Sequence, residues 1–212
     1  MSFVSAKISF GYRIKIILTF SFLFAFGYGF TNRFPVFTPK TLPICWVDTF
    51  LGFHPWTIWI YISDYLLIFL PAILISDISA MKRLIKGFLV DFAVHFPIFF
   101  FFPTTMIRPT LPKDGFINWV FHLEWLLDTP VNCFPSQHVS LCFVVAMGFW
   151  NYQRKTSILF FIWSILISIS TMTTKQHYFS DVIGGMLVAL IVYLLVYQRK
   201  REPHITLVSP NK

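Results

Sequence analysis

Two residues near the end of the chain, His177 and Asp181, form the strongest chemical pattern in the sequence, within the segment KQHYFSD at 175–181. Side chains four residues apart share one face of a helix, so the carboxylate can accept a proton from one imidazole nitrogen. The other nitrogen is then left unprotonated and can act as a nucleophile at phosphorus. A structural His–Asp pair that ties two helices together has the same spacing, so the pattern alone fits both interpretations.

A second pattern, NCFPSQHV at 132–139, predicts the start of a helix, because proline is favoured in a first turn. The backbone amides of Ser136, Gln137 and His138 would then be among the donors that have no partner inside the helix. These amides, the helix dipole and the Ser136 hydroxyl can hold phosphate oxygens, while His138 can protonate a leaving alcohol. A capped helix with an interfacial histidine would have the same sequence.

Two cations complete a phosphate site. In FPTTMIRPT at 102–110, two prolines end the preceding helix and present Arg108, whose forked donors match phosphate oxygens. Lys175 lies two residues before His177. Either cation alone also suits contact with lipid headgroups.

The composition requires a bilayer around these residues. Hydrophobic residues make up 56% of the 212 residues, charged residues make up 12%, and the mean hydropathy is +0.69. About 20 apolar residues cross a membrane as a helix, and six such stretches predict an all-α polytopic membrane bundle. They run over 14–31, 56–76, 84–102, 133–150, 156–174 and 178–197. The fourth stretch is the weakest because its first third is polar. A short amphipathic helix is predicted within 113–128.

The placement of Lys and Arg predicts the orientation. Twelve of the 17 fall before the first helix, in the alternate short loops or in the tail, so both termini are expected in the cytoplasm. The candidate catalytic and phosphate-binding residues then lie on the non-cytoplasmic face. The protein is expected to be a multi-pass protein of the cell inner membrane or an equivalent membrane. Because the cations are spread over separate segments, the net charge of +8 does not indicate nucleic-acid binding. One domain over 1–212, with a basic cytoplasmic tail at 198–212, is the simplest organisation.

Three ionisable residues, Asp64, Asp91 and His95, lie inside predicted spans, where such groups are costly and therefore functional candidates. A transporter or a non-catalytic membrane protein is the hypothesis they support. Asp91 and His95 are four residues apart, which favours a structural pair. His122 and Glu124 are neighbours in the sequence, do not share a helix face, and receive no role.

Over about 100–185, the pattern resembles the type 2 phosphatidic acid phosphatase superfamily, which includes lipid phosphatases, vanadium haloperoxidases and sphingolipid synthases. Its three motifs are matched by Arg108-Pro109, by Pro135-Ser136-Gln137-His138, and by Ser170-Thr171 with His177 and Asp181. The family cations would fall at Phe101 and Thr171, which leaves Lys175 as their replacement. The segment around Lys175 resembles an inositol phosphorylceramide synthase-like subgroup.

The resemblance implies a phosphoric ester hydrolase in which His177 forms a phosphohistidine, Asp181 orients it, and His138 is the general acid. Arg108, Lys175, Ser136 and the Gln137 amide would hold the phosphate oxygens, with no metal and no cofactor required. The expected substrate is a lipid phosphate monoester or pyrophosphate in the membrane. A lipid phosphotransferase that moves a phospho-headgroup to a lipid alcohol is the alternative. The oligomeric state is left open.

Overall fold

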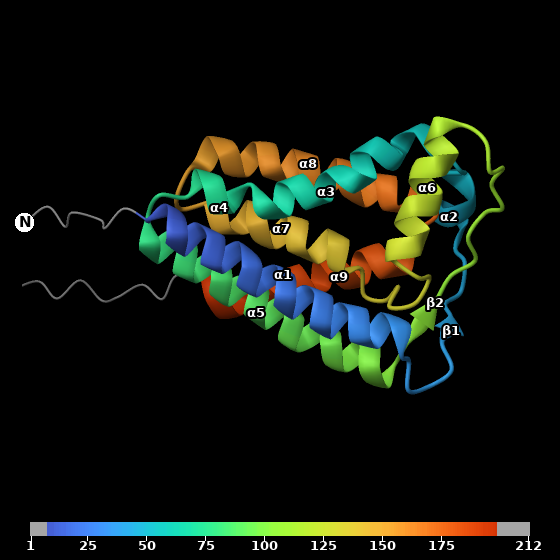
Figure 1. The fold of residues 1–212 in the computed structure, drawn as a ribbon, viewed down its shortest axis with the longest axis horizontal. Helices are drawn as coiled ribbons and strands as arrows, with labels where there is room; N and C mark the ends of the chain where they lie inside the picture. The colour runs from blue at the N-terminus through green and yellow to red at the C-terminus, as the bar shows by residue number, and fades with distance from the viewer. Residues whose placement is uncertain (1–7, 199–212) are drawn as a thin grey trace, which may run out of the picture.

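Long apolar helices dominate the computed structural model, which describes residues 8–198 (Figure 1). The main helices are α1 (Phe10–Arg33), α3 (Ile58–Phe69), α4 (Pro71–Leu74), α5 (Ile78–Phe101), α7 (Gln137–Phe149), α8 (Arg154–Thr173) and α9 (Phe179–Val192). A 3-10 turn, η1 (Pro55–Thr57), precedes α3, and a π-helical turn, η2 (Tyr193–Tyr197), continues α9. The protein is an all-α membrane bundle, as the sequence predicts.

Five helical segments of the described chain are long and apolar enough to cross a membrane. They are Phe10–Arg33, Pro55–Leu74, Ile78–Phe101, Arg154–Thr173 and Phe179–Tyr197. Each overlaps one predicted stretch. The largest shift is at α5, which begins six residues earlier than predicted because the Asp77 carboxylate caps it by accepting from the Ala80 amide at 2.6 Å.

The fourth predicted span, 133–150, is shorter than expected. Helix α7 has 13 residues, and residues 133–136 precede it as non-helical chain. Ten of the 13 residues are buried, and α7 packs against α3, α5, α8 and α9. Because α7 lies in the middle of the bundle, the polar residues of its first turn lie inside the protein.

Helices α7 and α9 approach each other very closely at their first turns. The Ser136 amide donates to the carbonyl of Asp181 at 2.9 Å. A Cβ added to Gly185 on α9 would lie 2.3 Å from the Ser136 carbonyl oxygen. The glycine therefore permits a backbone contact that any other residue would prevent.

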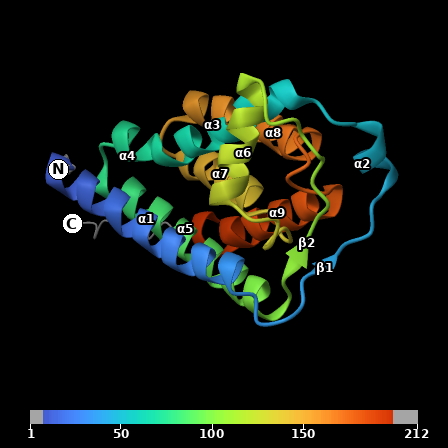
Figure 2. The same ribbon diagram turned by 45° about the vertical axis from the view of Figure 1, so that its right-hand side comes forward.

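Short elements gather at one end of the bundle, opposite the end where α1 begins (Figures 1 and 2). They are α2 (Trp46–Phe50), α6 (Phe116–Leu127) and the parallel pair β1 (Lys40–Thr41) and β2 (Thr104–Thr105). The α6 helix confirms the helix predicted within 113–128. The buried Asn32 at the end of α1 donates to Asp128 Oδ1 and to the carbonyls of Thr129 and Val131, so it fixes the chain between α6 and α7. The predicted tail at 198–212 lies outside the described residues, apart from Gln198.

We expect Gly185→Ala to lower the stability of the detergent-solubilised protein, because the added methyl group must push α9 away from Ser136. Overpacking of this kind costs about 1–3 kcal/mol, or about 2–12 °C in Tm for a chain of this size. Gly29→Ala on α1 is the matched control, since nothing lies within 4 Å of its added Cβ. Equal melting temperatures for the two variants would show that the α7–α9 contact does not constrain the fold.

Candidate active site

The nucleophile candidate, His177, lies at the end of the turn between α8 and α9. Its side chain is 6% exposed, and Nδ1 lies 3.5 Å from Oδ2 of the fully buried Asp181. This is an ion-pair distance without good hydrogen-bond geometry, and Oδ2 also accepts from the Tyr178 amide at 2.8 Å. Catalytic hydrogen bonds are often long before substrate binds. The pair is therefore placed so that Nδ1–H can face the carboxylate and leave Nε2 unprotonated.

The turn before His177 is held by backbone hydrogen bonds. The amides of Gln176 and His177 both donate to the carbonyl of Thr171, at 2.9 and 3.1 Å. The Thr171 hydroxyl donates to the Ser168 carbonyl within α8. Thr171, which takes the place of a family cation, thus fixes the backbone of His177 through its carbonyl group.

The acid candidate, His138, has a carboxylate partner that the sequence analysis did not assign to it. Its Nδ1 lies 2.6 Å from Oδ2 of Asp64 on α3, and Asp64 is fully buried. The sequence marked Asp64 only as an ionisable residue within a span, because the contact joins segments 74 residues apart. The Asp64 carboxylate can fix the tautomer and orientation of His138 and stabilise its protonated form.

On the side of the His138 ring away from Asp64, two tyrosine hydroxyls and Glu124 form further polar contacts. The Tyr61 hydroxyl lies 3.1 Å from Nε2 of His138, and the Tyr61 and Tyr65 hydroxyls donate to Glu124 Oε1 at 3.5 and 3.2 Å. Burial raises the pKa of Glu124, and the nearby His138 partly offsets that increase. Glu124, which received no role from the sequence, is therefore a member of the network around His138.

The two histidines face each other. Their ring centroids are 5.7 Å apart, and the ring planes make an angle of 62°. Each ring has its own carboxylate, Asp64 for His138 and Asp181 for His177. One imidazole can thus act as a nucleophile while the other donates or accepts a proton at the same small group.

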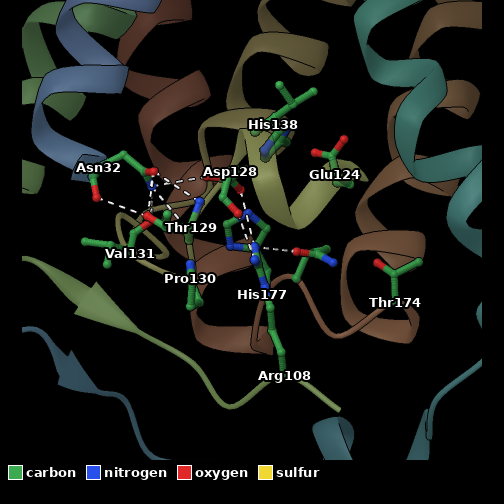
Figure 3. A network of polar contacts seen from close by, with 12 residues as sticks. Asn32, Arg108, Glu124, Asp128, Thr129, Pro130, Val131, His138, Thr174 and His177 are labelled. Atoms are coloured by element: carbon green, nitrogen blue, oxygen red, sulfur yellow. Dashed lines mark hydrogen bonds and ion pairs between the residues drawn. The ribbon is translucent and has the colours of Figure 1, made fainter. Parts of the chain in front are cut away.

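Arg108 is held beside this centre by α6 and by the turn before α9. Its guanidinium donates to the Asp128 carbonyl at 2.7 Å and to Gln176 Oε1 at 2.8 Å, and it lies 3.6 Å from the Asp128 carboxylate. Asp128 also accepts from Asn32 (Figure 3) and from the Tyr28 hydroxyl. Gln176 directly precedes His177, so its hydrogen bond with Arg108 makes Arg108 and His177 parts of the same candidate site.

Three buried nitrogen donors around Arg108 have no hydrogen-bond acceptor among the described residues. They are Arg108 Nε, Gln176 Nε2 and Trp125 Nε1, and the guanidinium carbon lies 5.6 Å from the centre of a Trp125 ring. Unpaired buried donors are costly unless a ligand accepts from them. The sequence did not predict Gln176 or Trp125 as site residues. For Gln176, its position next to His177 was a signal that could have indicated this role.

At the start of α7, Ser136 and Gln137 are partly engaged by the protein. The Ser136 amide was predicted to be free, but it donates to the Asp181 carbonyl, because α9 approaches it closely. The Ser136 hydroxyl accepts from the Val139 amide at 3.4 Å, which is a helix cap. The Gln137 side chain donates to Asp91 at 3.3 Å, so only its backbone amide, in the first turn of α7, suits an anion.

Lys175 makes its hydrogen bond with α2. Its ammonium donates to the Asp48 carbonyl at 2.7 Å, and no contact joins it to His177 or Arg108 in the described part of the chain. Burial lowers the pKa of Lys175, and Asp48 partly offsets this. The structure therefore does not bring Lys175 together with the other predicted phosphate ligands.

The predicted pair of Asp91 and His95 is confirmed. His95 Nδ1 lies 3.1 Å from Asp91 Oδ1, both side chains are fully buried, and Asp91 also accepts from the Ser140 hydroxyl at 2.6 Å. The pair holds α5 against α7 below the two catalytic candidates.

Comparison with known proteins identifies the family of the chain. Residues 43–195 match the model of the PAP2 superfamily. An uncharacterized protein of Methanocaldococcus jannaschii is 33% identical over 72 residues, which cover 34% of this chain and 30% of that protein. The match thus spans less than a third of that relative's length, and no solved structure is a significant match. The chain belongs to the PAP2 superfamily, the type 2 phosphatidic acid phosphatases and related enzymes.

Proposed function

We propose that the protein hydrolyses phosphate esters or pyrophosphates of membrane lipids through a phosphohistidine on His177. The observation that carries the proposal is the pair of facing histidines, 5.7 Å apart and each backed by a buried carboxylate. A single histidine with a carboxylate would also suit a structural role. Two such pairs with adjacent rings can supply both a nucleophile and a proton donor.

In the first step, Nε2 of His177 attacks phosphorus and the bond to the lipid oxygen breaks. His138 donates its Nε2 proton to that oxygen, so a monoester releases a neutral alcohol and a pyrophosphate releases a lipid monophosphate. In the second step, water attacks phosphorus, His138 takes the water proton, and the bond to His177 breaks. Because the Tyr61 hydroxyl now lies at Nε2 of His138, the lipid oxygen must share or displace that contact.

The phosphate oxygens would be held by Arg108, the Gln137 amide, the Ser136 hydroxyl and the unpaired donors of Gln176 and Trp125. Lys175 is a weaker candidate, since its ammonium must first leave the Asp48 carbonyl.

The alternative is transfer of a phospho-headgroup to a lipid alcohol, as in the synthase-like subgroup. One observation favours it: Arg108 is itself paired with Asp128, and the family cations are replaced by Phe101 and Thr171. A site with so little net positive charge suits a singly charged phosphodiester better than a doubly charged monoester. A lipid alcohol would then replace water in the second step.

For the membrane arrangement, we propose cytoplasmic termini and an active site at the opposite face, within a single domain. The excess of Lys and Arg in the alternate loops supports this orientation.

The function is tested by incubating the purified protein with radiolabelled lipid phosphate monoesters, pyrophosphates and phosphodiesters, with and without diacylglycerol or ceramide. Release of inorganic phosphate supports hydrolysis, and a new labelled lipid supports transfer. If the wild-type protein forms neither product, or forms as much as His177→Ala does, the proposal is wrong.

We expect Asp64→Asn to slow turnover of lipid phosphates by about 10²–10⁴-fold, because His138 loses the carboxylate that orients it as an acid. With 4-nitrophenyl phosphate, whose leaving group needs little protonation, the loss should be below tenfold. Asp91→Asn is the control, since this equally buried carboxylate pairs with His95. Values of kcat/KM on both substrates check the prediction, because kcat/KM reports formation of the phosphohistidine and not its hydrolysis. An equal loss of kcat/KM on both substrates in Asp64→Asn would show that Asp64 does not assist protonation of the leaving group.

We expect Arg108→Gln to weaken competitive inhibition by inorganic phosphate about 10- to 100-fold, the usual loss for a charged hydrogen bond. Lys175→Gln should change the inhibition constant less than threefold, because its ammonium binds the Asp48 carbonyl. Inhibition constants for both variants and the wild type check this. A comparable loss in Lys175→Gln would show that this lysine turns toward the phosphate, as the sequence predicted.

A further inference from the structure

An apolar cavity runs from His138 into the membrane part of the bundle. Its cavity volume is about 220 Å³, and the cavity is open at its mouth. Helices α1, α3, α4 and α5 form its walls, with residues such as Ile16, Phe20, Phe24, Ile68, Leu84 and Phe88.

Polar groups line the cavity mainly at the end next to the catalytic candidates. Asp64, Gln137 and His138 lie on its wall, and they belong to the site described above. At the far end, the Arg13 guanidinium donates to the carbonyls of Ala72 and Ile73 and so joins α1 to α4. The cavity is therefore apolar along its length, and the catalytic candidate His138 lies at one end.

The length of the cavity matches one leaflet of a bilayer. Its lining on α1 extends from Ile16 to Tyr28, which is about 18 Å at 1.5 Å per residue. The hydrocarbon core of a membrane is about 30 Å thick, so one leaflet contributes about half of that. A hydrocarbon chain anchored at the level of His138 would fit this depth.

Resting on the proposed function, we infer that this cavity binds one hydrocarbon chain of the substrate lipid, on the leaving-alcohol side of phosphorus. The oxygen that His138 protonates belongs to this alcohol, so its chain must begin beside His138. The phosphate lies on the other side, toward His177 and Arg108. The enzyme thus selects a phosphate attached to a long apolar alcohol, and chain length contributes to its specificity.

Ser21→Trp tests the inference, because Ser21 lines the cavity on α1 and an indole there would fill it. Thr19→Trp is the matched control, an exposed hydroxyl residue on the same helix that does not line the cavity. We expect Ser21→Trp to lower kcat/KM at least tenfold for a long-chain phosphatidic acid and less than twofold for 4-nitrophenyl phosphate. Thr19→Trp should stay within twofold of wild type on both. Equal effects of Ser21→Trp on the two substrates, or no effect, would overturn the inference.

A binding measurement separates this inference from the proposed function. Phosphatidic acid with a photoreactive diazirine at the end of its chain is irradiated with the His177→Ala protein, and the labelled residues are mapped by mass spectrometry. We expect labels on cavity residues such as Ile17 and Ile85, lost with excess unlabelled phosphatidic acid and in Ser21→Trp. Labels confined to exposed residues such as Leu18 and Phe22, or labels that no competitor removes, indicate ordinary membrane lipid and overturn the inference. Specific cavity labelling in a protein whose wild type shows no turnover would leave chain binding standing and refute the enzymatic proposal.

Discussion

The close contact between the first turns of α7 and α9 is the constraint on which the site depends. Because Gly185 has no side chain, the Ser136 amide can reach the Asp181 carbonyl at 2.9 Å. This contact places His138, in the first turn of α7, next to the turn that ends at His177. The two imidazoles then face each other at 5.7 Å, although they lie 39 positions apart in the sequence.

Burial determines how the carboxylates of the site are paired and how much charge the site carries. Asp64 and Asp181 are fully buried, and a carboxylate in such surroundings must be paired or hydrogen-bonded. Each lies against a histidine, so the bundle fixes the orientation of both rings. The same burial limits the charge that the site can carry: Arg108 is paired with Asp128, and the unpaired donors beside it, on Trp125 and Gln176, are neutral groups.

The sequence predicted the parts of the structure that depend on local pattern. Hydrophobic length gave five of the six spans, and local rules predicted a helix start in the PSQH segment and a His177–Asp181 pair. Two details were wrong: Pro135 lies before the Ser136 cap and not in the first turn of α7, and His177 lies before the Tyr178 cap of α9, so the pair does not share a helix face. Contacts between distant segments were not predictable. Nothing near Asp64 in the sequence indicates that it contacts His138, and nothing near Glu124 indicates that Tyr61 links it to His138. Lys175 was expected in the phosphate site, but its ammonium donates to the Asp48 carbonyl. The site residues that the sequence did not predict are thus placed by the packing of α3 on α7 and of α6 on α3, which has no local signature.

The proposed passage of the phosphoryl group through His177 is the step on which the mechanism depends. Its most direct test is the stereochemical course of the reaction with a substrate made chiral at phosphorus by oxygen isotopes and sulfur. Each in-line displacement inverts phosphorus, so attack by His177 followed by attack of water or a lipid alcohol predicts overall retention. Overall inversion would show a single displacement without a phosphohistidine, and it would contradict the assignment of His177 as nucleophile.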